Sequence, residues 1–412
     1  MDGKHVPFSK YCCQYLLLVS LLACSSANIE TGDYSFQIST VDGVIIAETK
    51  NGPKYSDPLF SLEEVARIQE DVSNEDTLLA QPRWMGIDEE GMIYVFDGVY
   101  SRHESRLIVY HPDGTFSHVI GRGGRGPGEY MYPKLVSTRE GTVTIFEPSL
   151  RRLSQFSRTG TFQRLFTSTP GDALPDVAYL DDHDKQIIIY STRTDRWSSQ
   201  QAVTYSIDGV ELGLIESPRV PRHDGMRFRE GLWNTPSQFC GRAMMGYSPL
   251  HGIMYTDGNE AAVKWYDLSG ELKKVFDFGM ASGPVSESDR ELADSYFRNL
   301  WLDGNPLGAD LYNAWIKEDN FPKFRAFWND FSIDEYGYLW LEDPSSQFSA
   351  TERFLRVVSP EGEYLGNCTL PQGEGKISNG HYLLIDRDLD SDEWRLIVYK
   401  LIPTLEGLNY PN

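Results

Sequence analysis

The stretch IDEEGMIYVFD at Ile87–Asp97 reappears as IDEYGYLWLED at Ile333–Asp343. In both, turn-forming residues surround a glycine and are followed by strand-forming residues, a pattern that predicts a β-hairpin leading into a strand. Four more segments share the pattern: STREGTVTIFE at 137–147, LDDHDKQIIIY at 180–190, SPLHGIMYTDG at 248–258 and KISNGHYLLID at 376–386. The chain therefore contains six copies of one local structure.

A second hairpin follows each of the first five copies. Its sequences are VYHPDGTF (109–116), QFSRTGTF (155–162), TYSIDGVEL (204–212), KWYDLSGEL (264–272) and VVSPEGEYL (357–365). Two hairpins per unit predict a four-stranded antiparallel meander. Six such units, spaced 43 to 85 residues apart, predict an all-β protein with a six-bladed β-propeller fold. A large β-sandwich or a two-domain β protein is the alternative.

The sixth unit indicates how the ring closes. Its third strand is expected at 394–401, and the sequence reaches Asn412 without a second hairpin. The segment 60–69, which precedes the first full unit, is expected to supply the outer strand of this blade, because an open edge would leave backbone groups unpaired. The propeller is thus expected to span 59–403, with a tail at 404–412.

One segment between the fourth and fifth units breaks the strand pattern. We expect a helical insertion at 284–322, with Ser288 and Glu291 as a capping box and Leu292, Tyr296 and Leu300 on one helical face. A second short helix is expected at 310–317. The insertion either covers one end of the ring as a lid or packs on the rim.

The first 23 residues have the features of a secretory signal, with lysines before an apolar run at 15–22. The ending Leu-Leu-Ala-Cys resembles the lipobox of bacterial lipoproteins, which implies cleavage before Cys24 and acylation of that cysteine. Ser25 resembles the sorting context for the outer membrane of Gram-negative cells, although either leaflet remains open. We therefore expect attachment to the lipid bilayer through Cys24 and a tether at 24–58 with one extra strand near 44–47. An ordinary signal peptide is the alternative.

Composition excludes several classes of protein. The 38 basic and 60 acidic side chains leave a net charge of -22, which would repel nucleic acids. Outside the first 24 residues the cysteines are Cys240 and Cys368, too few for a disulfide framework. They either pair with each other or are buried thiols.

The stretch IGRGGRGPGEY at Ile120–Tyr130 carries a family resemblance. Together with the lipobox and the six units, it resembles the six-bladed NHL-repeat and TolB-like propeller lipoproteins of Gram-negative bacteria. The resemblance covers nearly the whole mature chain and implies the fold but no general activity. Its loop contains Gly-x-Gly-x-x-Gly, yet Pro127 and Gly128 follow where a dinucleotide site needs a helix. We expect Arg122, Arg125, Glu129 and Tyr130 to connect adjacent blades or, alternatively, to bind a ligand.

Acidic residues alternate near the C-terminus, at Asp386, Asp388 and Asp390. Carboxylates at this spacing suit Ca²⁺, but the glycine and glutamate positions of an EF-hand loop are not matched, so a solvated turn is the simpler interpretation. No other cofactor is expected. No nucleophile elbow, His-Glu-x-x-His motif or phosphate-binding loop occurs.

Two hypotheses for function follow. The first is a non-catalytic, monomeric propeller that binds or scaffolds an envelope protein, peptide or glycan. Its best contact patch is basic and aromatic, and comprises Arg222, Arg227, Phe228, Arg229 and Trp233. The alternative is a channel-centred hydrolase or lyase, either without a metal or dependent on one as lactonases of this fold are.

Overall fold

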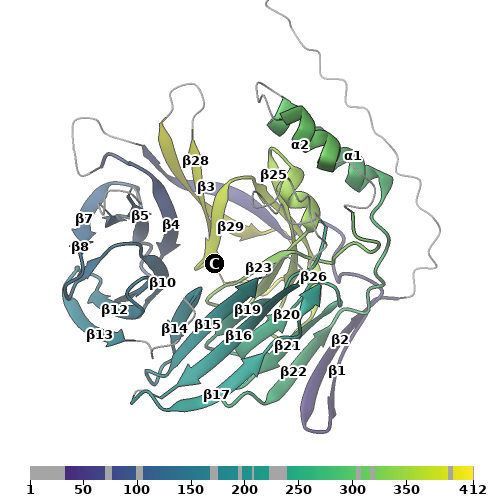
Figure 1. Cartoon of the computed structure of the whole chain (residues 1–412), viewed down its shortest axis with the longest axis horizontal. Coiled ribbons are helices and arrows are strands. Elements are labelled where there is room, and N and C mark those ends of the chain that lie inside the picture. Colours follow the sequence, from purple (N-terminus) through teal and green to yellow (C-terminus); the bar gives the residue numbers. More distant parts are fainter. Residues whose placement is uncertain are drawn as a thin grey trace, which may run out of the picture. The chain divides into compact units, whose positions relative to one another are not determined.

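The computed structural model describes residues 33–69, 77–98, 105–167, 175–193, 197–206, 208–221, 239–302, 308–315, 321–387 and 393–411. The chain divides into two units, 1–33 and 34–412, and the fold belongs to the second. This unit is a six-bladed β-propeller of four-stranded antiparallel sheets, as the sequence predicted (Figure 1).

The blades are numbered along the chain, and each runs from an innermost to an outermost strand. Blades 1 to 3 contain β4 (Pro82–Ile87), β5 (Ile93–Asp97), β6 (Arg106–Tyr110) and β7 (Phe116–Ile120); β10 (Lys134–Arg139), β11 (Thr142–Glu147), β12 (Arg152–Ser157) and β13 (Phe162–Thr167); and β14 (Val177–Leu180), β15 (Gln186–Arg193), β16 (Trp197–Tyr205) and β17 (Glu211–Glu216). The short β18 (Val220–Pro221) also pairs with β16.

The other three blades follow the same order. They contain β19 (Met244–Ser248), β20 (Gly252–Thr256), β21 (Ala262–Tyr266) and β22 (Leu272–Asp277); β23 (Asp330–Ile333), β24 (Leu339–Glu342), β25 (Glu352–Val358) and β26 (Tyr364–Pro371); and β27 (Glu374–Ser378), β28 (His381–Arg387), β29 (Trp394–Pro403) and β3 (Phe60–Gln69). Innermost strands of neighbouring blades touch, as β4 does with β10 and β27.

The ring closes through β3, the strand that the sequence assigned to the last blade. It pairs antiparallel with β29, and the register places Ile68 opposite Leu396 and Leu62 opposite Leu401. Ile68, Leu396 and Leu401 are buried, so a strand from the start of the propeller completes the core of its last blade. Burial of this apolar surface favours closure of the ring. The pairing of β3 with β29 also satisfies the backbone groups at the edge of β29.

The segment before β3 differs from the expected tether with one strand. It forms a hairpin of β1 (Ser35–Val41) and β2 (Val44–Lys50), and β2 pairs in parallel with β22 of blade 4. Asp42 and Gly43 both have positive φ angles, of 49° and 82°, which suits a two-residue hairpin turn. The prediction missed this Asp-Gly signal, and blade 4 consequently has a six-stranded sheet.

The helical insertion comprises α1 (Glu287–Leu302) and α2 (Gly308–Trp315). Its capping box is not the expected Ser288 and Glu291 pair. Instead, the Ser286 hydroxyl accepts from the Asp289 amide at 3.1 Å, and the Asp289 carboxylate accepts from the Ser286 amide at 3.0 Å. Ser286 is the N-cap because α1 begins at the next residue, Glu287, whereas Ser288 already lies inside the helix.

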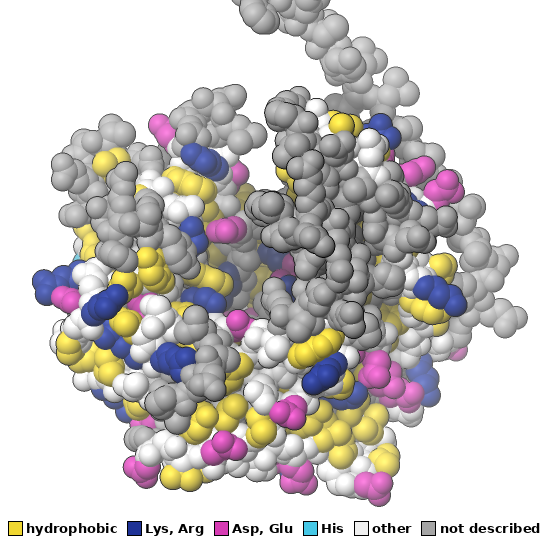
Figure 2. All heavy atoms as spheres, viewed as in Figure 1, with side chains coloured by type: hydrophobic (Ala, Val, Ile, Leu, Met, Phe, Trp, Pro, Cys, Tyr) yellow, Lys and Arg dark blue, Asp and Glu magenta, His cyan; other side chains and the backbone are white. Residues whose placement is uncertain are grey.

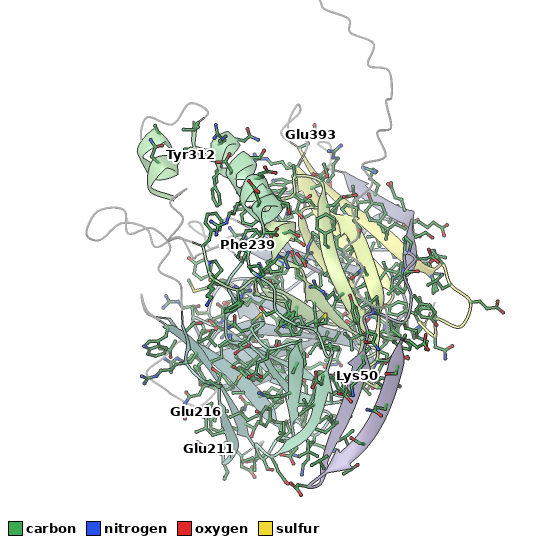
Figure 3. The ribbon with its side chains drawn as sticks, turned by 90° about the vertical axis from the view of Figure 1, so that its right-hand side faces the viewer. Lys50, Glu211, Glu216, Phe239, Tyr312 and Glu393 are labelled. Carbon is green, nitrogen blue, oxygen red and sulfur yellow. The ribbon has the colours of Figure 1, made fainter. Side chains whose placement is uncertain are left out.

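The insertion packs against blade 5 rather than standing apart from it. A 3-10 helix, η2 (Pro344–Phe348), connects β24 to β25 and meets α1. Phe348 lies in one apolar cluster with Phe297 of α1, Tyr312 of α2 and Phe239, two of which Figure 3 labels. The insertion therefore packs on the loop between the second and third strands of blade 5.

The two cysteines outside the N-terminal region do not pair with each other. Cys368 lies buried in β26, where burial raises the pKa of its thiol to about 12. Such a thiol is unreactive at neutral pH.

Candidate functional site

The two ends of the ring differ in how they are built. One end, here called the turn end, carries both hairpin turns of blades 1 to 5 and the single hairpin turn of blade 6. Turns of neighbouring blades are joined by hydrogen bonds: the side-chain amide of Asn379 donates to the Ile87 carbonyl at 2.6 Å, and the Thr138 hydroxyl donates to the same carbonyl at 3.1 Å. Ser378 donates to Glu335 at 2.7 Å. These bonds link blades 5, 6, 1 and 2 at the turn end.

The tail, described over 404–411, makes further hydrogen bonds at this end. Tyr410 is buried, and its hydroxyl donates to Asp334 at 2.9 Å, while the Trp340 indole donates to the same carboxylate at 3.0 Å. Tyr338 donates to the carbonyl of Asn409. Burial raises the pKa of Asp334 to about 6, even though the hydrogen bonds that it accepts work in the opposite direction.

The opposite end, here called the connection end, carries the loops between second and third strands and the connections between blades. In three blades an acidic residue at or next to the end of the second strand lies opposite an arginine at or next to the start of the third: Asp97 and Arg106, Glu147 and Arg152, and Asp386 and Arg395. The first and third pairs form ion pairs at 3.1 and 2.8 Å. The sequence repeat did not reveal this recurring pair.

Glu147 is held differently. Its carboxylate accepts from the backbone amides of Met131 and Tyr132, at 2.5 and 3.1 Å. It also accepts from the Ser149 hydroxyl at 2.7 Å. The carboxylate therefore anchors the chain that enters blade 2.

A network of charged side chains lies at the connection end of blade 5. Asp343 accepts from Arg325 and Arg356, and Arg325 also contacts Asp289 of α1 at 3.1 Å. Burial disfavours the ionised form of Asp343, but the two arginines outweigh it and lower its pKa to about 2. Acidic and basic side chains are likewise interspersed on the face shown in Figure 2.

The glycine-rich loop at 120–130 connects blades 1 and 2. Arg122 pairs with Glu129 at 2.7 Å, and Glu129 also accepts from the Gly126 amide at 2.8 Å. The loop contains the two-residue parallel ladder of β8 (Arg122–Gly123) and β9 (Glu129–Tyr130) and no helix. This geometry is incompatible with a dinucleotide fingerprint, which needs a helix N-terminus at that point.

Tyr130 and Arg152 hold this loop in place. The Tyr130 hydroxyl donates to the Ile120 carbonyl and accepts from the Leu107 amide at 2.7 Å. Arg152 of blade 2 donates to the carbonyls of Arg125 (2.7 Å) and Glu129. Arg125 itself contacts the Met131 sulfur at 3.3 Å. Sequence reasoning named four loop residues but missed Arg152, because no local motif links a strand residue to a loop more than twenty positions away.

The most exposed aromatic group of an innermost strand is near this loop. Trp84 is 47% exposed and is the extra residue of a β-bulge in β4, where the register shifts between Arg83 and Met85. Bulges re-aim side chains and are frequent next to functional sites. The sequence offered no signal for this, since a bulge reverses the alternation from which side-chain direction is predicted.

Lys134 completes a small cluster around Trp84. Its ammonium lies 5.8 Å from the centre of the Trp84 ring and donates to the Asp176 carbonyl at 2.6 Å. Burial lowers the pKa of Lys134. Trp84 belongs to blade 1 and Lys134 to blade 2, and Asp176 immediately precedes the first strand of blade 3. The cluster therefore lies near the start of three innermost strands.

A shallow depression surrounds Trp84. It is lined by Arg83, Trp84, Phe96, Asp97, Gly98, Ser105, Tyr132 and Pro133. Its volume of about 20 Å³ has room for a water molecule or two. It cannot enclose a small molecule, but a larger ligand could lie across it.

Several predicted site residues lie outside the described residues: Cys24, Arg222, Arg227, Phe228, Arg229, Trp233, Asp388 and Asp390. Asp386 is described, and its carboxylate pairs with Arg395. In the described ranges, no group of three His, Cys, Asp or Glu side chains is placed to hold a metal ion. In the same ranges no helix has the length and apolar character needed to cross a membrane.

A family model described as a 6-bladed beta-propeller, DUF5128, matches residues 73–197. This range includes blades 1 and 2 and the glycine-rich loop. None of the curated protein sequences matches the chain.

Solved structures with a similar fold have low sequence identity. A protein from Bacteroides fragilis, described as a candidate exported protein, is 11% identical with a TM-score of 0.45, covering 86% of this chain and 99% of its own. A DUF4221 family member from Bacteroides vulgatus is 10% identical with a TM-score of 0.42, covering 84% and 99%. The calcium-binding protein regucalcin from Agrobacterium tumefaciens is 9% identical with a TM-score of 0.38, covering 87% and 100%.

Proposed function

We propose that the chain is a lipid-anchored, non-catalytic binding propeller of the Gram-negative envelope, and that it binds a glycan across the connection end of the ring. The anchor rests on the lipobox-like sequence before Cys24. The binding site rests on the cluster of Trp84 and Lys134.

The exposed indole of Trp84 is the observation that carries this proposal. Trp84 is 47% exposed on an innermost strand, so apolar surface of its indole ring is in contact with water. A ligand that covers this surface gains the free energy of burying it. Aromatic rings combine a large apolar face with electron density that attracts polarised C–H groups and cations. Sugar rings present such C–H faces, and Tyr132 and Arg83 line the same depression.

The arrangement of charges favours binding over catalysis. A general acid or base must be within reach of substrate and able to exchange a proton. At the connection end, Asp97, Glu147 and Asp343 already accept hydrogen bonds from arginines or backbone amides of the protein. Carboxylates held in this way stabilise the segments whose backbone amides and arginines they contact.

The shallowness of the depression bears on ligand size. Enclosed sites for small molecules are clefts of roughly 300 to 1,000 Å³. The exposed Trp84 ring beside a depression of about 20 Å³ instead suits one sugar unit of a longer glycan that continues over the surface. A polysaccharide fits this description better than a free sugar.

Affinity electrophoresis tests the proposal, with soluble bacterial and plant polysaccharides as probes and isothermal titration on any that retard the protein. Trp84→Ala is expected to weaken binding at least tenfold, and Trp84→Phe less. Phe324→Ala is the matched control, because Phe324 is also an exposed aromatic, at 54%, and lies outside the depression. Unchanged affinity in Trp84→Ala, or wild-type binding to peptides but to no polysaccharide, would contradict the proposal.

A further inference from the structure

The outer edge of blade 4 differs from the edges of the other blades. The hairpin of β1 and β2 adds two strands outside β22, and β1 is the outermost strand of the resulting sheet (Figure 1). Among the described residues, β1 pairs with β2 alone, so its other edge presents a row of backbone donors and acceptors.

Natural proteins protect such edges, and four of the other outermost strands show how. Charged residues occur in β3, β13 and β17, the last of which begins and ends with Glu211 and Glu216 (Figure 3). The edge of β26 ends in Pro371, and its first carbonyls accept from the amides of Lys54 and Tyr55, at 2.9 and 2.8 Å. Charge, proline and coverage all discourage the addition of a further strand.

β1 has none of these protections. Its sequence SFQISTV contains neither a charged residue nor a proline over seven residues. Ile38 and Val41 are each 55% exposed on it. β7 is also uncharged apart from its histidine, but it has five residues and its His118 contacts the Arg158 carbonyl at 2.9 Å. An unprotected edge of this length is a surface on which an extended strand can pair.

The two faces of β1 define what such a strand would carry. Phe36 and Ile38 are opposite Thr49 and Ala47, which are buried, so these two apolar residues lie on the side facing the core. Gln37 is on the other side, where its amide donates to Glu48 at 2.6 Å. A strand added beside β1 would therefore place apolar residues next to Phe36 and Ile38, alternating with polar ones.

The net charge of the chain favours a different polypeptide over a second copy of this chain as the partner of β1. A second copy would bring another net charge of -22 to the edge, and like charges oppose association. We infer that β1 is a docking edge for an extended segment of another polypeptide, of alternating apolar and neutral or basic residues, which adds to the blade 4 sheet as a seventh strand. The edge of β1, in the blade 4 sheet, is separate from the depression around Trp84 in blade 1.

The test uses the chain from residue 33 onward beside the full chain, with the acetylated peptide TVKVTVK as the probe and its proline variant TVKPTVK as the peptide control. Fluorescence anisotropy is expected to detect binding of the first peptide and at least tenfold weaker binding of the second. Hydrogen exchange is expected to slow at amides within 35–41. Ile38→Lys should reduce binding at least tenfold, whereas Val210→Lys, at a site 62% exposed in blade 3, should not.

Thermal melting checks that both variants fold. Thr40→Lys, at an exposed position on the same side of β1 as Ile38, provides a second edge variant with the same expected loss. Absence of protection within 35–41, or equal effects of Ile38→Lys and Val210→Lys, would overturn the inference. Dimerisation in sedimentation that Ile38→Lys abolishes would assign the edge to a second copy instead. Binding of the unlipidated chain to phosphatidylethanolamine and phosphatidylglycerol vesicles that depends on Ile38 would assign it to lipid. If the two sites are independent, Trp84→Ala should lose glycan binding and keep peptide binding.

Discussion

Removal of a single hydroxyl group, in Tyr130→Phe, tests how the glycine-rich loop is held against blade 1. The Tyr130 side chain is 1% exposed, and its hydroxyl bridges the Leu107 amide and the Ile120 carbonyl, which belong to opposed residues of β6 and β7. The phenylalanine ring can keep its edge-to-face contact with Phe96, whose centroid lies 5.5 Å away. The variant therefore isolates the hydrogen bonds from the packing.

The expected loss follows from the groups left behind. An unsatisfied buried donor or acceptor costs about 1 to 3 kcal/mol. The Leu107 amide loses the acceptor at 2.7 Å, while the Ile120 carbonyl retains a second lone pair for other donors. We expect the free energy of unfolding to fall by about 2 kcal/mol. Tyr130→Ala, which also removes the ring, should cost about 3 to 5 kcal/mol.

Urea unfolding followed by tryptophan fluorescence and circular dichroism measures these losses. The control is Tyr296→Phe, because Tyr296 lies on α1 with 36% of its side chain exposed, and its hydroxyl should contribute less than about 0.5 kcal/mol. If Tyr130→Phe is no less stable than this control, the hydroxyl does not clamp the loop. The reasoning about the blade connection would then be wrong.

Two further predictions concern the tail and the anchor. Because the pKa of Asp334 is raised to about 6 from an ordinary 3.8, its protonation stabilises the fold fully below pH 3.8, and this contribution is lost as the pH rises through 6. Relative to Asp334→Asn, the wild type should gain about 1 kcal/mol between pH 8 and pH 5 in urea unfolding; a stability difference equal at both pH values would refute this. In Gram-negative cells fed labelled palmitate, the wild type should be labelled and Cys24→Ser should not, with Cys12→Ser as the control; equal labelling of both variants would exclude acylation at Cys24.

The strands were predictable because their signals are local. Alternation of apolar residues around Gly91 and Gly337 is enough to place a hairpin, and repetition of the pattern predicted both the number of blades and the need for β3 to close the last. The first hairpin was missed although Asp42 and Gly43 carry the same kind of signal, since a tether was expected there. Helix α1 was predicted, but its cap shifted from Ser288 to Ser286.

The candidate site was not predictable from these signals. Trp84 follows the strand pattern in sequence, and the bulge that turns it outward arises from how β4 pairs with β5. Its neighbour Lys134 is fifty residues away along the chain and meets it because adjacent innermost strands touch. The basic and aromatic patch favoured by the sequence, including Arg227 and Trp233, lies outside the described residues and remains a prediction.

The amino-acid sequence by itself determined six repeated sheets, the order in which they follow one another, and the strand that completes the last. Only the tertiary structure decided that Trp84 lies beside Lys134, that Tyr410 reaches Asp334, and that Arg152 binds the carbonyls of the glycine-rich loop. The reason is physical: backbone pairing in a meander depends on residues close in sequence, whereas contacts between blades depend on which side chains the ring brings together when its sheets pack.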